Sequence, residues 1–413
     1  MFRRLSNTLP KDPLFPSNLE ALGLFVNDKD QIRQIKNPEQ EYPYRISKND
    51  RVNEMHKEAI HIWIRKNILG RLQDLGLEIL RLPLGASTTE PHVPVLVSQD
   101  LSTKKRVLVY IGDRSNELGV IAYRIIGHEG IAKGSLIDIV KLARSINPDN
   151  EEHSLGFIIA NPGQLVWHRR ESQTLSFATW ECLPKKSAVE VPIQMDSTKN
   201  CIPDNENSQK HVASIFNHVI KNHVNPNAKL DIIGVCEGAM DIVQFLNRNW
   251  SVWGSCTSAI ALSEPYHDFE YLTDPNFRNF LAQHCRAYFA GEGGLDEEAP
   301  ESSRFGCKCY YSGEGYILEC IFPKAARSIL SFFKESAGHS DSSKVGHSVN
   351  TCERQAGEQE PCEKSLSKGL KEGNSHSLPG PYVPYKKDTS ILRIATVATS
   401  NEVSVADAFE YLL

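Results

Sequence analysis

Hydrophobic residues between about positions 50 and 334 follow two alternating patterns. Some form short apolar runs of about four to eight residues, which are typical of buried strands, and others recur every three or four positions, as on one face of a helix. The predicted strands are residues 77–82, 93–97, 106–111, 157–160, 230–235, 257–262, 286–290 and 307–311. Helices are predicted between a cap at Asp50 and Gly76, after Gly238, and at residues 118–126, 131–144, 211–224, 277–284 and 323–334.

The order of these elements predicts an α/β protein. Short loops join the first predicted strands, and short loops suit antiparallel pairing. From residue 106 onward, strands alternate with helices, and connections of this kind give parallel strands with helices packed on them. We therefore expect a mainly parallel sheet with an antiparallel N-terminal edge and helices on both faces.

Three segments lie outside the predicted domain of residues 51–334. Residues 1–50 are rich in proline and charge, and we expect an arm laid across the domain. Residues 335–388 consist mostly of Ser, Gly, Glu, Lys and Pro, which cannot bury enough apolar surface to offset the entropy lost on ordering. They are predicted to be a disordered linker. Residues 389–413 regain hydrophobic residues and either dock on the domain or bind a partner.

The segment from Lys229 to Trp250 joins an apolar strand to an amphipathic helix through the turn GVCEG, residues 234–238. This turn has the form Gly-x-nucleophile-x-Gly, which between a strand and a helix predicts a nucleophile elbow. Gly234 and Gly238 would let the backbone pass close to its neighbours, and Cys236 would project above the sheet. At the start of a helix the dipole favours the thiolate, so Cys236 is a candidate nucleophile. The alternative is a small buried hydrophobic residue.

A hydrolase with this elbow also needs oxyanion donors, a general base and an acid that orients the base. The amide of Glu237 and one near Gly112 or Asp113 are the candidate donors. The candidate acid follows the penultimate strand and is Asp296, Glu297 or Glu292, with Glu264 or Asp268 after the preceding strand as alternatives. The turn after the last strand, residues 312–316, contains no histidine where the base is required. His267, in an earlier loop at the same edge of the sheet, is the remaining candidate base. Its alternative is an ordinary surface histidine, and the catalytic set is predicted to be degraded.

Composition narrows the possible functions. The chain has 413 residues, of which 40% are hydrophobic and 23% charged, as in ordinary soluble globular proteins. A formal net charge of −5 argues against electrostatic binding of nucleic acid by the protein as a whole. The ten cysteines lack paired metal-ligand spacing, so we expect free thiols and no metal. Neither a long apolar run that would span a membrane nor a phosphate-binding glycine loop is present, and no cofactor is expected.

The cluster Trp167-His168-Arg169-Arg170 stands out from the segment around it. It lies in residues 164–203, which are too long and too irregular to be a simple connection between two elements. Such a loop could cap the site or carry partner contacts. The cluster itself suits stacking on bases or binding of phosphates, or else is an exposed loop anchored by one tryptophan.

Several short motifs between residues 2 and 334 resemble one known family. They are LFPSNL at 14–19, QIRQI at 31–35, LRLPLG at 80–85, EPHVP at 90–94, NPGQL at 161–165, the elbow at 234–238 and SGE at 312–314. The family is the fungal argonaute-binding proteins of the Arb-two domain type, which are related to animal cotranscriptional regulators.

This resemblance implies an α/β-hydrolase-like domain that works with an argonaute-type complex in small-RNA-directed heterochromatin silencing, in the nucleus, the cytoplasm or both. Small RNA would then be associated through the partner. The family often carries serine where Cys236 stands, and the histidine of the last strand is absent, so we expect a non-catalytic binding protein. One alternative is a Cys-dependent ester hydrolase of the dienelactone hydrolase type, with His267 as a displaced base. Another is a lipid or small-molecule sensor that kept the pocket and lost turnover.

Overall fold

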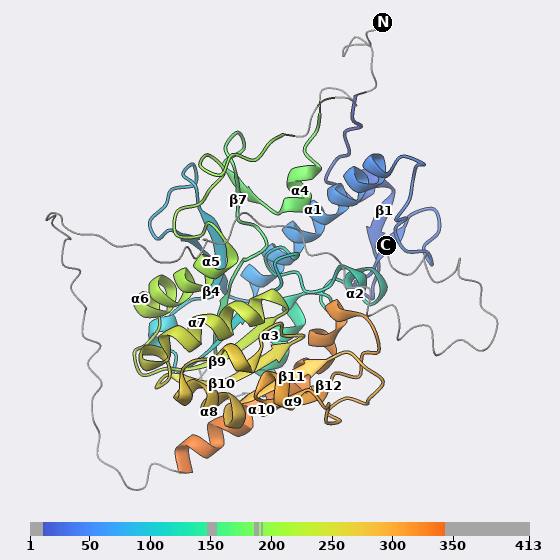
Figure 1. Ribbon diagram of the computed structural model, residues 1–413. Helices are drawn as coiled ribbons and strands as arrows, with labels where there is room; N and C mark the ends of the chain where they lie inside the picture. The colour runs from blue at the N-terminus through green and yellow to red at the C-terminus, as the bar shows by residue number, and fades with distance from the viewer. Residues whose placement is uncertain (1–10, 147–154, 186–189, 191–192, 343–413) are drawn as a thin grey trace, which may run out of the picture. The chain divides into compact units, whose positions relative to one another are not determined.

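The computed structural model describes residues 11–146, 155–185, 190 and 193–342 (Figure 1). Within these residues, eight strands form one sheet in the order β12-β11-β10-β9-β5-β6-β4-β3. Their bounds are β3 (Leu77–Leu82), β4 (Val93–Ser98), β5 (Arg106–Ile111), β6 (Gly156–Ile159), β9 (Lys229–Val235), β10 (Thr257–Ser263), β11 (Cys285–Phe289) and β12 (Lys308–Tyr311). Strand β4 is antiparallel to both of its neighbours, and the other pairs are parallel. The predicted sheet is confirmed, and its strand order is that of the α/β-hydrolase fold.

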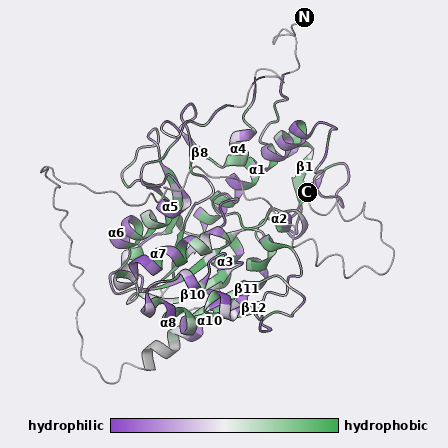
Figure 2. Ribbon diagram, in the orientation of Figure 1, coloured by the Kyte–Doolittle hydropathy of each residue, from purple (hydrophilic) through white to green (hydrophobic). Residues whose placement is uncertain are grey.

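Two hydrophobic layers cover the two faces of the sheet. On β5, Val107 and Val109 belong to one layer, and Leu108 and Tyr110 to the other, because successive side chains of a strand point to opposite faces. The first layer packs against α5 (Ser208–Ser214), α7 (Glu237–Trp253) and α8 (Pro275–His284), and the second against α1 (Asp50–Asp74), α3 (Leu136–Ile146) and α10 (Ile321–Ser342). Figure 2 shows the hydrophobic colour concentrated on the strands between these helices.

The N-terminal arm contributes a turn and a small hairpin. They are η2 (Glu20–Leu22), β1 (Leu24–Val26) and β2 (Ile32–Gln34), with β1 and β2 antiparallel. Leu19, Leu24 and Ile32 are buried in the hydrophobic layer that contains α1. Arg33 donates a hydrogen bond of 2.8 Å to the carbonyl oxygen of Gly127. The arm therefore lies against the domain over its described residues, and residues 1–10 lie outside them.

The remaining short elements occur in the connections. They are η3 (Leu101–Thr103), α2 (Tyr123–His128), β7 (Val166–His168), β8 (Gln173–Leu175), α4 (Phe177–Glu181), the π-helical turn η5 (Ile215–Ile220), α6 (Lys221–His223), η6 (Phe269–Tyr271), α9 (Ser302–Phe305) and η7 (Leu318–Cys320). The predicted helix over 211–224 is thus three consecutive helical pieces. No helix in the described part of the chain is long and apolar enough to cross a membrane.

Two helix boundaries near the start of the domain can be compared with their predictions. The N-cap of α1 is Asn49, whose side chain accepts a hydrogen bond of 3.0 Å from the amide of Arg51, so the predicted cap at Asp50 is wrong by one residue. Gly76 follows the helix with a φ of 75°, a left-handed conformation that favours glycine, and the predicted end is confirmed.

The predicted helix over 118–126 is wrong in its first half. Gly119 has a φ of 83°, which a right-handed helix excludes, and Val120 forms an isolated β-bridge with Ser135 instead. Only α2 is helical here. The same bridge delays the next helix, since α3 begins at Leu136 and not at the predicted residue 131.

The last helix is longer than expected. Helix α10 begins at Ile321 and continues to Ser342, so the predicted disorder starting at residue 335 is wrong for its first residues. Extending an established helix requires no new nucleation, which allows it to continue beyond its buried positions Phe332 and Phe333. The rest of the predicted linker and the C-terminal segment 389–413 lie outside the described residues.

Candidate functional site

The predicted elbow is present at the carboxyl end of β9. Strand β9 ends at Val235, α7 begins at Glu237, and Cys236 between them has φ 50° and ψ −118°. A side chain in this region of conformational space is strained, and such strain persists only where surrounding structure enforces it. The amide of Cys236 donates a hydrogen bond of 2.8 Å to the carbonyl oxygen of Ser263 on β10. This bond fixes the bend to the neighbouring strand.

Both elbow glycines stand where a side chain does not fit. A Cβ atom added to Gly234 would lie 2.6 Å from the Cα of Ala239, closer than real Cβ contacts allow. A Cβ added to Gly238 would collide with the carbonyl oxygen of Gly112, at the end of β5. The structure thus brings Gly112 and the elbow together, as the fold requires for an oxyanion hole. The role of the Glu237 amide and of an amide near Gly112 as oxyanion donors stays a prediction.

The Cys236 thiol is buried beside an acidic group. Cys236 as a whole residue is 4% exposed. Burial raises the pKa of Cys236, and the charge of Asp113 and a hydrogen bond with its carboxyl group raise this pKa further, while a hydrogen bond with Tyr266 acts in the opposite direction. The expectation that the helix dipole gives a thiolate is therefore wrong. The thiol is protonated at neutral pH because desolvation and a neighbouring carboxylate outweigh the dipole.

Other polar groups at the elbow are carboxyl and phenol groups. Burial and the Asp113 carboxylate raise the pKa of Glu237, whose side chain also lies 3.5 Å from the guanidinium of Arg114. Burial, together with the neighbouring Cys236 and Glu237 side chains, raises the pKa of Tyr266. The strongest electrostatic influences on the thiol come from Asp113, Tyr266 and Glu237, and none of them is a histidine.

His267 is placed differently from its predicted role as a base. Its Nε2 lies 3.0 Å from the carbonyl oxygen of Phe305 in α9, and its ring packs edge-on against the Phe305 ring with centroids 5.4 Å apart. The residue is 4% exposed, so the alternative of a surface histidine is wrong. Its neighbour Tyr266 contacts the thiol instead. His267 holds the loop after β10 against α9.

Asp296, the candidate acid, connects β11 to α10. It accepts hydrogen bonds from the hydroxyl of Tyr288 at 3.2 Å and from the hydroxyl of Ser328 at 2.6 Å. Both carboxylate oxygens are therefore occupied by hydroxyl donors. In these contacts Asp296 stabilises the packing of two elements and orients no imidazole.

The turn after β12 is filled by a carboxylate and its partners. Glu314 accepts a hydrogen bond of 3.2 Å from the amide of Tyr316, and its side chain pairs with Lys324 of α10 at 2.7 Å. The carbonyl oxygen of Glu314 accepts a bond of 2.8 Å from the amide of Gly291. In an active hydrolase of this fold the histidine base follows this strand. Here an ion pair takes its place.

Sequence reasoning missed two side chains that control the thiol, the carboxylate of Asp113 and the phenol of Tyr266. Asp113 directly follows the candidate Gly112, and Tyr266 directly precedes the candidate His267. The candidates Gly112 and His267 therefore lie in the correct loops, but the side chains that act on the thiol are those of their neighbours. Across the described residues, no group of three or more His, Cys, Asp or Glu side chains is arranged to hold a metal ion.

Among solved structures, hydrolases are similar to this chain. Est1E from Butyrivibrio proteoclasticus is 7% identical and has a TM-score of 0.33, over 64% of this chain and 99% of that chain. A thioesterase domain from the curacin biosynthetic pathway is 11% identical and has a TM-score of 0.33, over 62% and 99%. At such scores the similarity adds nothing to the fold assignment, which rests on the strand order and the elbow.

Comparison of sequences gives a more specific result. The Cotranscriptional regulator ARB2A homolog of Gallus gallus is 24% identical over 371 residues, which are 82% of this chain and 86% of that protein. Cotranscriptional regulator ARB2A of Mus musculus is 23% identical over 359 residues, or 80% and 83%. The family model described as the Arb2 domain matches residues 15–293, most of the domain that carries the elbow. The chain therefore belongs to the Arb2 domain family.

Proposed function

We propose that this protein is a non-catalytic member of the hydrolase fold that regulates gene expression cotranscriptionally in the nucleus. Its specific role is that of an argonaute-binding partner in small-RNA-directed heterochromatin silencing. Membership of the Arb2 family and the names of the two relatives, both cotranscriptional regulators, support the regulatory role. The argonaute partner and the silencing pathway go beyond what these names state, and the partner has a test of its own below.

The observation that carries the non-catalytic part is the state of the Cys236 thiol. Burial and Asp113 keep it protonated, and a cysteine nucleophile attacks as the thiolate. A base with a pKa near 7 would be needed to remove its proton and later to protonate the leaving group. Nε2 of His267 is bonded to Phe305, and Glu314 with Lys324 occupies the turn where that base belongs. Within the described residues, neither position expected for the proton carrier of a Cys-dependent hydrolase provides one.

Esterase assays on the full-length purified chain test this part. We expect p-nitrophenyl acetate to be hydrolysed by the wild type no faster than by Cys236→Ala, and a thiol-reactive ester probe to leave Cys236 unlabelled. Saturable turnover that disappears in Cys236→Ala would overturn the non-catalytic assignment and establish the dienelactone-hydrolase alternative. A circular dichroism spectrum of Cys236→Ala confirms that the variant is folded.

Direct binding to purified argonaute from the same organism tests the partner. We expect a complex with the wild type and an equally stable complex with Cys236→Ala, since the proposed contact does not use the thiol. Absence of binding between the two purified proteins would remove argonaute from the proposal. Loss of binding in Cys236→Ala alone would instead mean that the elbow takes part in partner binding.

A further inference from the structure

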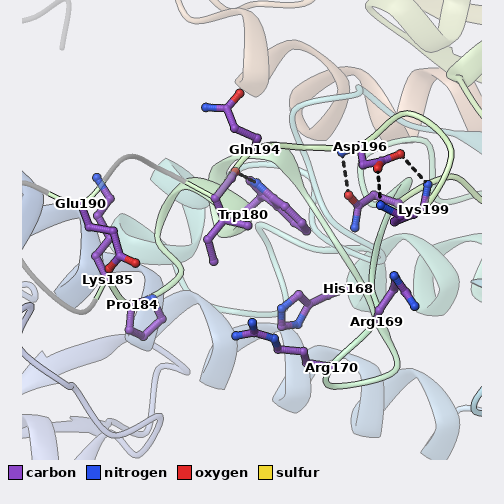
Figure 3. Close-up of a pocket in the computed structure, with 12 residues that line it drawn as sticks. His168, Arg169, Arg170, Trp180, Pro184, Lys185, Glu190, Gln194, Asp196 and Lys199 are labelled. Atoms are coloured by element: carbon purple, nitrogen blue, oxygen red, sulfur yellow. Dashed lines mark hydrogen bonds and ion pairs between the residues drawn. The ribbon is translucent and has the colours of Figure 1, made fainter.

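A cleft of about 700 Å³ lies away from the elbow, in the segment between β6 and α5 (Figure 3). One wall is the turn that joins β7 to β8, and the other walls come from α4 and from the loop around residues 193–200. Three residues of the cluster singled out in the sequence, His168, Arg169 and Arg170, line the first wall. The candidate site at the elbow does not use the side chains of this cluster.

The lining of the cleft carries a surplus of positive charge. Four cationic side chains, those of Arg169, Arg170, Lys185 and Lys199, stand against two carboxylates, those of Glu190 and Asp196. Lys199 pairs with Asp196 at 3.0 Å, and Asp196 also accepts hydrogen bonds from backbone amides. Arg169 and Arg170 are exposed, and neither guanidinium has a hydrogen bond or ion pair within the described residues.

An incompletely satisfied histidine lies on the same wall. His168 is 8% exposed, and its Nδ1 has no hydrogen-bond partner among the described residues, the nearest carboxylate being that of Glu171 at 3.8 Å. Its ring meets Trp180 edge-on, with centroids 5.8 Å apart. Buried polar atoms are normally hydrogen-bonded, so this nitrogen and the two arginines beside it leave hydrogen-bonding capacity for a ligand.

The turn that carries the arginines is firmly held. Trp167 is buried, and its backbone amide and carbonyl both bond to Asn200, at 2.9 and 2.8 Å. On the other side of the cleft, the indole nitrogen of Trp180 donates a bond of 2.8 Å to the carbonyl oxygen of Ile193. A braced site loses less conformational entropy when a ligand binds than a mobile one.

We propose that this cleft binds the phosphate backbone of a single-stranded nucleic acid, which is RNA in the setting of the proposed function, on which this inference rests. Guanidinium groups match phosphate oxygens in geometry and charge. A positively charged groove follows the backbone of a single strand, and because the lining Trp180 is only 6% exposed, the binding expected here is to phosphates and not by base stacking. Cationic side chains line the cleft at several separate points, Arg169 and Arg170 in the turn between β7 and β8 and Lys185 after α4, which suits successive phosphates better than the single phosphate of a modified protein.

Local binding is compatible with the charge of the whole chain. The formal net charge is −5, so a polyanion gains no attraction from the protein as a whole, and contact depends on the surplus at the cleft. The sequence suggested that small RNA associates through a partner protein, and the cleft adds a direct contact between RNA and this chain. Neutralising the arginines should consequently remove most of the binding.

Fluorescence anisotropy with a labelled single strand of about 12 nucleotides tests the cleft in the full chain. RNA and DNA of the same sequence are each titrated at several salt concentrations. We expect Arg169→Gln/Arg170→Gln to weaken binding at least about tenfold and to reduce the slope of log K against log salt by roughly 1.4, since each lost phosphate contact contributes about 0.7. The matched control is Arg248→Gln/Lys308→Gln, which removes the same charge from exposed positions on α7 and β12 and should bind as the wild type does.

Three results would overturn the inference. They are absence of wild-type binding to either strand, equal binding by the cleft variant and the wild type, and tighter binding of a phosphoserine peptide than of RNA at the cleft. Argonaute binding is measured on the same preparations. If argonaute binds while RNA does not, this inference fails and the proposed function stands. If RNA binds while argonaute does not, the cleft binds nucleic acid and the argonaute partner is removed from the proposed function. Equal melting temperatures of the wild type, the cleft variant and the control variant exclude misfolding as the cause of weaker RNA binding.

Discussion

The ammonium group of Lys324 lies 2.7 Å from Oε2 of Glu314, in the turn after β12. The side chain of Glu314 is 10% exposed and that of Lys324 is 45% exposed. This pair joins the last strand of the sheet to α10 at the position that holds the histidine in active hydrolases of the fold. In those enzymes the residue at this position transfers protons, whereas in this protein the ion pair at this position holds the turn against α10.

Glu314→Gln should lower the free energy of unfolding by about 1 kcal/mol at pH 7, a modest value because Lys324 is half exposed. Burial opposes ionisation, but hydrogen bonds from Lys324, Tyr316 and Ile317 leave the pKa of Glu314 below its usual value. A carboxylate with a lowered folded pKa stabilises fully above its unfolded pKa, about 4.3, and loses this effect as pH falls through the folded value. Urea unfolding at pH 7 and below 4 should show the gap between variant and wild type closing; an unchanged gap would contradict the ion pair.

Asp113→Asn should make the Cys236 thiol more reactive. The carboxylate raises the pKa of Cys236, second only to burial, so removing its charge lowers this pKa. Each pKa unit removed raises the thiolate fraction, and with it the rate of iodoacetamide labelling at pH 8, up to about tenfold. Peptide mass spectrometry measures the label at Cys236, with the half-buried Cys201 as an internal reference. Equal labelling rates in variant and wild type would show that Asp113 does not control the thiol.

Two glycine substitutions should have opposite effects on stability. Gly234→Ala should destabilise the protein by about 1–3 kcal/mol, because its Cβ would lie 2.6 Å from the Cα of Ala239 and backbone would have to move. Gly70→Ala, inside α1 with no atom within 4 Å of the added Cβ, should stabilise by about 0.5–1 kcal/mol. Thermal or urea unfolding decides both signs. A stabilising Gly234→Ala would mean that the elbow is not as tight as described.

Arg65→Ala should destabilise the protein by about 3–5 kcal/mol. Arg65 lies 2.6 Å from Glu58 and 3.1 Å from Glu117, and all three side chains are largely buried, so its removal leaves two buried carboxylates without their positive partner. The control is Lys133→Ala, which breaks an exposed pair of 3.4 Å with Glu129 and should change stability by less than about 0.5 kcal/mol. Comparable effects of the two substitutions in urea unfolding would contradict the importance of burial.

His211→Gln should weaken the loss of stability in mild acid. Burial lowers the pKa of His211 to about 3, and its two ring nitrogens bond to the Asn205 side chain at 2.7 Å and to the Asn161 amide at 2.9 Å. Below the unfolded pKa of about 6.5 the unfolded chain binds a proton at this site and the folded chain does not, so folding loses about 1.4 kcal/mol per pH unit. Unfolding between pH 7.5 and 5 should therefore show a steeper decline in the wild type. Parallel pH profiles would mean that His211 charges in the folded protein.

Local signals sufficed for much of the fold. The strands at 77–82 and 106–111 have the bounds that the apolar runs predicted, and the elbow occurs at the predicted residues, because strand burial and a glycine-bounded turn depend on neighbours in sequence. The helix predicted over 118–126 failed because a bridge to Ser135 outweighed its periodicity. That contact is tertiary, and helical spacing gives no sign of it.

The sequence by itself determined the α/β architecture, the bent junction at Cys236 and the absence of histidine from the turn at residues 312–316, after the last strand. Only the tertiary structure decided the state of the thiol, since Asp113 and Tyr266 reach it from two loops far apart in the chain. It also decided that His267 bonds to Phe305. Secondary structure follows from short-range periodicity, whereas the pKa and partners of a side chain depend on burial and on charges brought close only when the sheet is assembled.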